Sequence, residues 1–227
     1  MSKKNLIIDV KNVSRYYGKE HSLVKALENV SMQVYEKSFL TITGPSGSGK
    51  STLLNILGFL IGPTKGEVFF EGKKMMYDDY DKMAGFRHEK IGIIFQSFNL
   101  IPVLTAKENV LVPLIIQKDI TEKEKENRAQ VLLEAVGLKN QADQYPAELS
   151  GGEKQRVAIA RALICNPAVV LADEPTANLD TKSAEEVLKV MRDLNEKSET
   201  AFIFSTHDPR VIQYAKEKLE LKDGRVV

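Results

Sequence analysis

Short apolar runs, each followed by a polar or glycine-rich segment, recur along this chain and predict the strands of a buried sheet. The runs cover residues 39–43, 91–95, 168–172 and 201–206. Runs without a polar face are typical of strands that are covered on both sides, and such strands usually belong to parallel sheets. The pattern therefore predicts an α/β domain built on a mostly parallel sheet.

Other segments have different strand patterns. Residues 6–17 and 23–35 alternate apolar and polar positions, and the polar stretch 15–22 forms their connection. Residues 66–73 read as a strand between turn glycines, and Asp223-Gly224 predicts a final hairpin.

Helical signals replace strand signals over residues 97–149, which predicts a helical subdomain inserted in the α/β core. Thr121 and Glu124 have the spacing of a capping box, in which the two side chains each bond to the other residue's backbone N–H. The helix that they begin is expected to stop at Gly137, because glycine readily adopts the left-handed conformation that ends a helix.

Three more helices are predicted along the second half of the chain. Ser150 and Glu153 form another capping box, whose helix must end near Asn166-Pro167. Residues 181–196 are amphipathic. Asp208-Pro209 caps the next helix, with proline at the first helical position.

The segment Gly44-Pro45-Ser46-Gly47-Ser48-Gly49-Lys50-Ser51 fits the pattern of the loop that wraps nucleotide phosphates. Its glycines let the backbone approach an anion and point N–H groups at it. Lys50 supplies a positive charge for the β- and γ-phosphates, and the Ser51 hydroxyl can ligate Mg²⁺. The predicted strand 39–43 precedes the loop, and a helix over 52–57 follows it, with its N-terminus toward the phosphates.

A chance match to this pattern is expected in about 1% of chains of this length. The strand before it and the helix after it favour nucleotide binding over an ordinary glycine-rich turn. The loop alone does not separate an ATPase from a GTPase or a kinase.

Polar residues directly follow the other buried strands: Gln96, Asp173 with Glu174, and His207. Each of these residues alone also fits a turn or a helix cap. Ligands of parallel sheets bind outside the carboxyl ends of the strands, so these residues are expected to surround one nucleotide. Asp173 is suited to bind Mg²⁺, and Glu174 is suited to act as the general base. Gln96 could bind Mg²⁺ or the attacking water, and His207 could hydrogen-bond the γ-phosphate.

Composition narrows the possible functions. The chain has 227 residues, 43% hydrophobic content and a net charge of +1, so it fits one α/β domain without a nucleic-acid footprint. The single cysteine, Cys165, excludes an internal disulfide and is expected to be a buried structural thiol. Residues 1–5 do not resemble a signal peptide, and the most hydrophobic window, 110–116, is too short to span a bilayer. A soluble chain is expected, with any membrane role acting through a partner.

Together these features resemble an ATP-binding cassette (ABC) ATPase subunit over essentially the whole chain. Residues 149–156, Leu-Ser-Gly-Gly-Glu-Lys-Gln-Arg, resemble the ABC signature, which is the most family-specific motif present. The other matches are residues 44–51 to Walker A, residues 169–174 to Walker B with its catalytic glutamate, Gln96 to the Q-loop, Asn178-Leu179-Asp180 to the D-loop, His207 to the switch histidine, and Tyr17 to the A-loop aromatic, with the adjacent Tyr16 as its alternative.

The resemblance implies a P-loop NTPase core with a mostly parallel sheet, an N-terminal antiparallel β-subdomain and an inserted helical subdomain. Residues 1–227 then form one domain, in which 1–96 and 150–227 are core and β-subdomain. The helical subdomain is about 97–149 plus the signature helix.

The resemblance also implies the site. The expected nucleotide-binding residues are Tyr17, Gly44, Pro45, Ser46, Gly47, Ser48, Gly49, Lys50, Ser51, Thr52, Gln96, Ser150, Gly151, Gly152, Asp180 and His207. The expected catalytic residues are Glu174, His207, Gln96 and Lys50, and the expected metal ligands are Ser51, Gln96 and Asp173. The cofactors would be ATP and Mg²⁺.

The partners follow from the same resemblance. They are a second copy of the chain, in a head-to-tail dimer that sandwiches two ATP, and a separate transmembrane permease at the inner face of the cell membrane. Residues 93–102, Glu108-Asn109-Val110 and the short tail resemble the lipoprotein-release and macrolide-exporter subfamily (LolD/MacB-type). No nucleic-acid partner is expected.

Three alternatives stay open. A mechanotransmission ATPase would regulate a cell-envelope process without moving a substrate. An ABC ATPase acting on DNA or ribosomes would be expected to carry coiled-coil, zinc or tandem-domain insertions, which this sequence lacks. A P-loop kinase would leave the Ser150 segment and His207 without a role.

Overall fold

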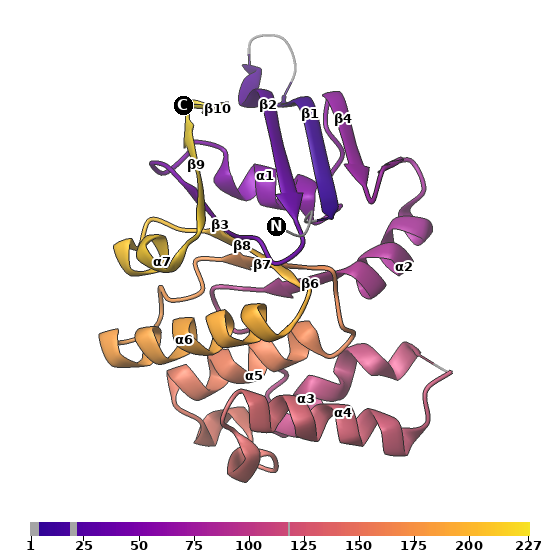
Figure 1. Cartoon of the computed structure of the whole chain (residues 1–227), viewed down its shortest axis with the longest axis vertical. Coiled ribbons are helices and arrows are strands. Elements are labelled where there is room, and N and C mark those ends of the chain that lie inside the picture. The colour runs from indigo at the N-terminus through magenta and orange to yellow at the C-terminus, as the bar shows by residue number, and fades with distance from the viewer. Residues whose placement is uncertain (1–4, 19–21, 118) are drawn as a thin grey trace.

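The computed structural model describes residues 5–18, 22–117 and 119–227, which form two sheets with helices around them (Figure 1). Residues 19–21 of the predicted polar connection and residues 1–4 lie outside the described part. One sheet has four strands in the order β2-β1-β4-β5, and the other has six in the order β10-β9-β3-β8-β7-β6.

The six-stranded sheet carries the strand ends that were expected to meet. Its strands are β3 (Phe39–Thr43), β6 (Ile91–Ile94), β7 (Val169–Asp173), β8 (Ala201–Ser205), β9 (Glu217–Lys222) and β10 (Arg225–Val226). The pairs β6·β7, β7·β8, β8·β3 and β3·β9 are parallel, and only β10 runs antiparallel to its neighbour β9. The predictions of a mostly parallel sheet and of a C-terminal hairpin at Asp223-Gly224 are confirmed.

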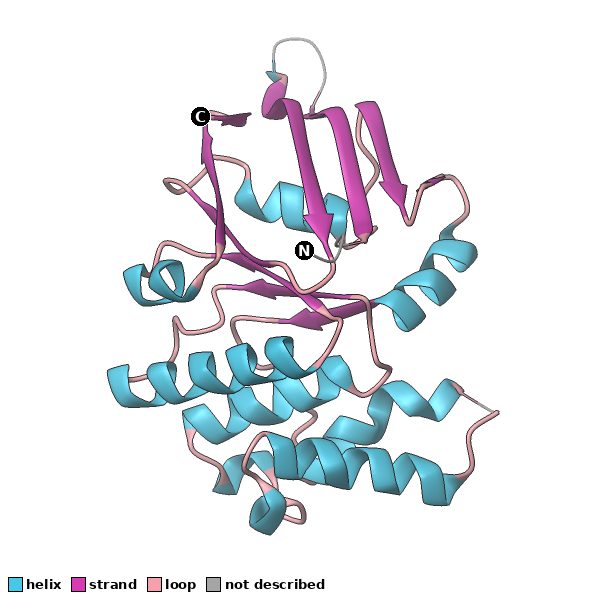
Figure 2. Cartoon of the chain, viewed as in Figure 1, coloured by secondary structure: helices cyan, strands magenta, loops and turns pink. Residues whose placement is uncertain are grey.

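The four-stranded sheet is antiparallel, and its long strands pass in front of α1 in the view of Figure 2. Its strands are β1 (Leu6–Tyr17), β2 (Val24–Tyr35), β4 (Lys65–Phe70) and β5 (Lys73–Lys74). Val30, Met32 and Val34 of β2 are buried with the expected period of two, whereas β1 buries the neighbours Ile7 and Ile8 because its register shifts there. The turn at Glu71-Gly72 divides the segment predicted as one strand over 66–73.

Helices cover both faces of the large sheet (Figure 1). They are α1 (Lys50–Leu57), α2 (Tyr80–Lys90), α3 (Ala106–Leu111), α4 (Glu122–Ala135), α5 (Gly151–Leu163), α6 (Thr181–Lys197) and α7 (Pro209–Tyr214), with 3-10 turns η2 (Val112–Ile116), η3 (Lys139–Gln141) and η4 (Pro146–Glu148). Helix α2 has no strong sequence signal, and among those of its side chains that the structure describes, Met83 alone is buried.

Alternation along the buried strands divides the core into two layers. Leu40, Ile42 and Ile203 face α1 and the antiparallel sheet, in one cluster of buried side chains. Phe202 and Phe204 face the opposite way, in a second cluster with α3, α4, α5 and α6. Both faces are therefore dry, as the continuous apolar runs of these strands predict.

Helix caps follow the sequence signals, with one correction. Ser150 and Glu153 make both halves of a capping box at the start of α5. Thr121 caps α4 by accepting from the Glu124 N–H, but the Glu124 carboxylate accepts a bond from Arg128 Nε at 2.9 Å. The predicted reciprocal box at Thr121 is therefore wrong, because a charged partner one turn away competes for the carboxylate.

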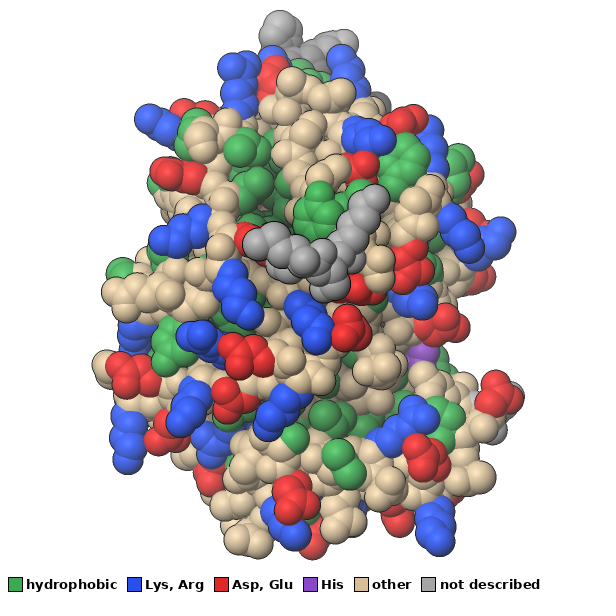
Figure 3. Space-filling view, in the orientation of Figure 1, with side chains coloured by type: hydrophobic (Ala, Val, Ile, Leu, Met, Phe, Trp, Pro, Cys, Tyr) green, Lys and Arg blue, Asp and Glu red, His purple; other side chains and the backbone are tan. Residues whose placement is uncertain are grey.

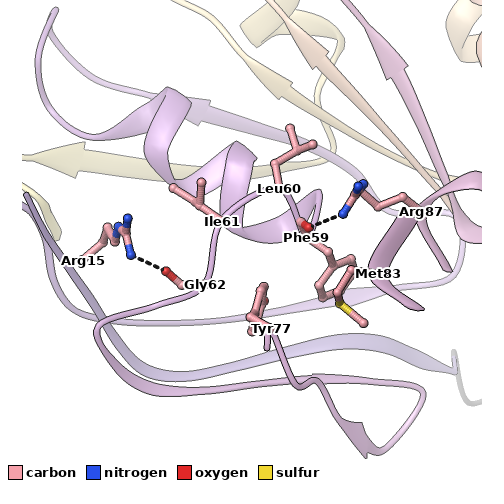
Figure 4. Close-up of a pocket in the computed structure, with 8 residues that line it drawn as sticks. All are labelled: Arg15, Phe59, Leu60, Ile61, Gly62, Tyr77, Met83 and Arg87. Atoms are coloured by element: carbon pink, nitrogen blue, oxygen red, sulfur yellow. Dashed lines mark hydrogen bonds between the residues drawn. The ribbon is translucent and has the colours of Figure 1, made fainter. Parts of the chain in front are cut away.

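Two arginines line a cavity of about 190 Å³ near the C-terminal end of α1 (Figure 4). Arg15 donates to the Gly62 carbonyl at 2.9 Å, and Arg87 donates to the Phe59 carbonyl at 2.8 Å. Cations are favourable at the negative end of a helix dipole, and α1 has no basic residue in its own last turn. These side chains therefore stabilise the chain where it leaves α1.

Cys165, which follows α5, is only half-buried. Burial raises the pKa of its thiol to about 11, and Gln117 Nε2 lies 3.7 Å from its sulfur. The thiol stays protonated at neutral pH, which fits a structural role and not that of a nucleophile.

We expect Phe202→Ala to lower the free energy of unfolding by about 3–5 kcal/mol, because it removes a fully buried ring that stacks on Phe39 and Phe204. Reversible urea unfolding followed by circular dichroism measures the effect. Val131→Ala on the exposed side of α4 is the control, with a change of less than about 0.5 kcal/mol. Equal midpoints for the two variants would contradict the two-layer core.

Candidate functional site

The loop between β3 and α1 is shaped by glycine. Gly44 has φ 144° and Gly49 has φ 103°, values that other residues rarely adopt. A Cβ at Gly44 would collide with the Leu221 carbonyl oxygen, and one at Gly49 would collide with the carbonyl oxygen of Ala26. These close approaches fix the loop against β9 and β2.

Lys50 lies at the start of α1 and bends back over the loop. Its Nζ donates to the carbonyls of Gly44 at 2.8 Å and Pro45 at 2.9 Å. The ammonium is therefore held over the loop in the place where phosphate oxygens would be recognised. An arriving anion competes with these two carbonyls for the same charge, and it also meets the N-terminal N–H groups of α1.

This loop forms one wall of a cavity of about 680 Å³. The expected site residues on its walls are Gly44, Pro45, Ser46, Gly47, Gly49, Lys50, Ser51, Thr52, Gln96, Asp173, Glu174 and His207. Ser48 does not line it: the side chain is buried, and its hydroxyl has no hydrogen-bond partner among the residues that the structure describes. The convergence of strand ends that the sequence predicts is therefore present.

Glu174 and His207 form a pair at the ends of β7 and β8. His207 Nδ1 lies 2.6 Å from Glu174 Oε1, and the Thr206 hydroxyl donates to Glu174 Oε2 at 3.2 Å. Glu174 has φ 46°, a left-handed conformation that its N–H bond to the Ser205 carbonyl, at 2.9 Å, helps to hold. The Glu174 side chain is 17% exposed, while that of His207 is 77% exposed.

The possible Mg²⁺ ligands share one chemistry. Ser51, Gln96 and Asp173 line the same cavity and offer a hydroxyl, an amide and a carboxylate oxygen. Hard oxygen donors of this kind suit Mg²⁺, which keeps several waters and takes one or two carboxylates plus phosphate oxygens. The three residues therefore fit the ion.

The signature residues lie apart from this cavity. Ser150, Gly151 and Gly152 are not among its lining residues, and Gly151 lies beside Asn178 and Leu179 instead. Ser150 Oγ donates to Glu153 Oε2 at 2.7 Å, and this hydroxyl lowers the pKa of the Glu153 carboxyl. The N-terminus of α5 is therefore not part of the cavity that its own chain's phosphate loop lines.

Asp180 is also outside the cavity, since it is the N-cap of α6. Its carboxylate accepts from the Ser183 N–H at 3.0 Å, and hydrogen bonds from Ser183 lower its pKa. The neighbouring Asn178 reaches the cavity wall, where its amide donates to the Gln96 carbonyl at 2.9 Å.

Tyr17 lies at the end of β1, where it pairs with Val24 of β2. Tyr17 does not line the cavity, but Val24 does. The Arg15 guanidinium lies 4.8 Å from the centre of the Tyr17 ring, so one face of this ring is already covered. Tyr16 has a lysine, Lys65, at 5.9 Å from its ring centre.

Sequence reasoning missed part of the cavity wall. Val24, Lys25 and Ala26 of β2 line it, as do Ala177 and Ser205. Nothing in the alternating pattern of β2 marks its first residues as functional, because they reach the phosphate loop only when the two sheets pack together. The close contact of Gly49 with Ala26 is the physical reason for their position.

Charges of both signs are interspersed over the face of the molecule in Figure 3, in keeping with a net charge of +1. Within the part of the chain that the structure describes, no helix combines the length and the apolar character needed to cross a bilayer.

Comparison with known proteins places this site in a family. The model of the ABC transporter family matches residues 27–177. The ABC transporter ATP-binding protein MJ1508 of Methanocaldococcus jannaschii is 46% identical over 222 residues, which are 97% of this chain and 98% of the relative. An ABC transporter ATP-binding protein of Thermotoga maritima is 45% identical over 97% of this chain and 93% of its own length.

A solved structure is similar as well. It is a dimeric structure of a post-hydrolysis state of the ATP-binding cassette MJ0796 bound to ADP and Pi, with a TM-score of 0.86 and 43% identity, covering 97% of this chain and 96% of that one. With its phosphate loop, its carboxylates at the strand ends and these relatives, the chain belongs to the ABC transporter family, as one of its ATP-hydrolysing cassettes.

Proposed function

We propose that this cassette powers a membrane transporter by coupling ATP-driven dimerisation to the movement of a separate transmembrane partner. The observation that carries the proposal is the position of the signature segment. Ser150 and its glycines lie outside the chain's own nucleotide cavity, although a capped helix N-terminus is an anion site. If the signature acts on ATP held by a second copy, one γ-phosphate meets two helix N-termini: that of α1 from the copy that holds the ATP, and that of α5 from the other copy.

Within one chain, the cavity residues divide the work of phosphoryl transfer. Lys50 exchanges its bonds to the Gly44 and Pro45 carbonyls for phosphate oxygens. Mg²⁺ held by Ser51 and Asp173 would neutralise charge on the phosphates. Glu174 accepts the proton of the attacking water, with its carboxylate oriented by His207.

Gln96 and His207 sense the nucleotide. Gln96 is exposed on the cavity wall and can orient the water or complete the Mg²⁺ sphere. His207, 77% exposed, is free to hydrogen-bond the γ-phosphate. Asp180, beside the signature, would come close to nucleotide across the dimer, and a tyrosine, Tyr17 or the adjacent Tyr16, would stack on the adenine.

The two copies would meet head to tail, with ATP as the bridge between them. In the relative MJ0796, a dimeric structure of the cassette exists, as does a dimer in a post-hydrolysis state bound to ADP and Pi. In this chain, the γ-phosphate charge would attract the positive end of α5 from the other copy. Its loss on hydrolysis would loosen the dimer, which turns chemistry into motion.

The membrane partner would contact the segment after Gln96. Ile101 is 39% exposed and Val103 is 79% exposed, and they follow the cavity residue Gln96 in the same loop. Phe98 and Leu100 of the same segment are half-buried and support its fold. The residues of segment 93–102 support a LolD/MacB-type assignment. The cassette would then lie on the cytoplasmic face of the membrane. Helices α3 to α5 would form one subdomain of a single domain.

We expect Glu174→Gln to reduce ATP turnover by about 10²–10⁴-fold, because it keeps the shape of the side chain and removes its basicity. Steady-state phosphate release measures turnover, and equilibrium dialysis measures ATP binding, which should stay near normal. Near-normal hydrolysis by the variant would contradict the role of Glu174.

The Glu174→Gln variant with ATP should be a dimer in light scattering, and a monomer with ADP. Adding Ser150→Arg should abolish this dimer, because a bulky side chain blocks the helix terminus that meets the other copy's phosphate. ATP binding by the monomer should stay nearly intact. Adding Thr121→Arg instead, at the N-cap of α4, is the control for the loss of a cap and should leave the dimer in place.

If the Ser150→Arg double variant lost ATP binding as a monomer, Ser150 would belong to its own chain's site. The head-to-tail arrangement would then be wrong.

Val103→Glu should reduce the amount of tagged cassette that co-purifies with membranes, because it places a charge in the proposed contact. Hydrolysis by the isolated chain and its thermal midpoint should not change, since Val103 is 79% exposed. Val131→Glu, on the exposed side of α4, is the matched control and should co-purify normally. An unfolded Val103→Glu chain would show that this position belongs to the core.

A further inference from the structure

The loop that follows β6 is anchored by three side chains from other elements. Asn178 holds the Gln96 carbonyl at the start of the loop. The buried Asn109 of α3 holds its end, where Nδ2 donates to the carbonyls of Ile101 and Leu104. Among the described side chains, the one that anchors the middle of the loop comes from the signature helix.

That anchor is Arg161 in the last turn of α5. Its Nη1 donates to the Asn99 carbonyl at 2.6 Å, and its Nη2 donates to the Phe98 carbonyl at 2.7 Å. Among the carboxylates of the described residues, none forms an ion pair with Arg161, and burial lowers the pKa of the guanidinium. The side chain is therefore committed to these two backbone oxygens.

The backbone that Arg161 holds is strained. Phe98 has φ 60° and Asn99 has φ 50°, so two consecutive residues other than glycine are left-handed. Side chains disfavour this conformation, and it persists only where surrounding contacts hold it. Arg161 supplies such contacts, since it binds the carbonyl oxygens of both strained residues.

Helix α5 connects this anchor to the signature. It runs from Gly151 to Leu163 as a regular helix, with the Ser150 capping box at one end and Arg161 near the other. A hydrogen-bonded helix moves as a rigid element, so a displacement of its N-terminus also displaces the guanidinium. The guanidinium in turn is bonded to the loop that begins with Gln96.

We propose that Arg161 is a positioning residue that transmits the placement of the signature helix to Gln96. When the ATP of a second copy binds at the N-terminus of α5, the helix moves, and the two hydrogen bonds of the Arg161 guanidinium move the loop 96–100 with it. This movement places the Gln96 amide in the cavity. The inference rests on the proposed function, in which the signature acts on the other copy's nucleotide. It adds a route by which each site responds to the nucleotide in the other.

Arginine is suited to this task and lysine is not. The planar guanidinium donates two parallel bonds to two carbonyls at once, while an ammonium is a compact point charge without this fixed geometry. Arg161→Lys therefore keeps the charge and loses the fork. It should give values between those of the parent and those of Arg161→Ala.

Hydrogen–deuterium exchange in the Glu174→Gln background tests the link directly. In this parent, ATP should slow exchange at 150–153, where the copies meet, and at 96–100. After Arg161→Ala, ATP should still slow exchange at 150–153 but no longer at 96–100. Arg192→Ala, which removes an exposed guanidinium of α6 that pairs with Glu196, is the matched control and should behave like the parent.

The outcomes separate the two ideas. If the parent shows no ATP protection at 150–153, the proposed function fails and the inference fails with it. If the parent shows protection in both segments and Arg161→Ala keeps both, the dimer model stands and the Arg161 link is wrong.

Kinetics of the chain with native Glu174 give a second measurement. Arg161→Ala should lower kcat about tenfold, because a misplaced group near the reacting atoms slows chemistry. The KM for ATP should stay the same, since the phosphate loop is untouched. Simple destabilisation would instead lower the amount of folded enzyme and leave the turnover of each ATP-binding site unchanged. If Arg161→Ala does not fold, Arg161→Lys carries both tests. A lysine variant with native kcat and native loop protection would overturn the proposal.

Discussion

Burial of the central sheet on both faces is the constraint from which the geometry of the site follows. Phe202 and Phe204 fill the layer toward α5 and α6, while Ile203 between them fills the layer toward α1. A sheet that is dry on both faces leaves only its strand ends for polar groups. The polar groups therefore meet at one edge of the sheet: the phosphate loop, Gln96, the carboxylates and His207 line a single cavity and can act on the same ligand.

The N-termini of α1 and α5 differ in their position relative to the cavity at that edge. The N-terminus of α1 lies under the phosphate loop, and arginines from other elements stabilise the chain at its C-terminal end. Helix α5 has a similar N-terminus, but its Ser150 hydroxyl is bonded to Glu153 and is not part of the wall of the chain's own cavity. In the dimer that we propose, the cavity of one copy holds half of the site and the N-terminus of α5 from the other copy supplies the other half.

Local signals made most of the elements predictable. Ser150 and Asp208 lie at the N-caps where their side chains predict them, because capping is decided within one turn of chain. Helix α2 was missed, since few of its side chains are buried and its pattern is weak. The Glu124 carboxylate was misassigned because Arg128, one turn on, offers it a charged donor that the capping pattern does not consider.

By itself, the sequence determined the phosphate loop, the buried strands and the polar residues at their ends, because each depends on neighbours a few positions away. Only the tertiary structure decided which distant groups share a space. It placed the start of β2 on the cavity wall, left Ser150 and Asp180 outside it, and paired Glu174 with His207. It also joined Arg161 to the carbonyls of Phe98 and Asn99, more than sixty positions back in the chain. Such contacts carry no signal in either segment, because they arise only when sheets and helices pack together.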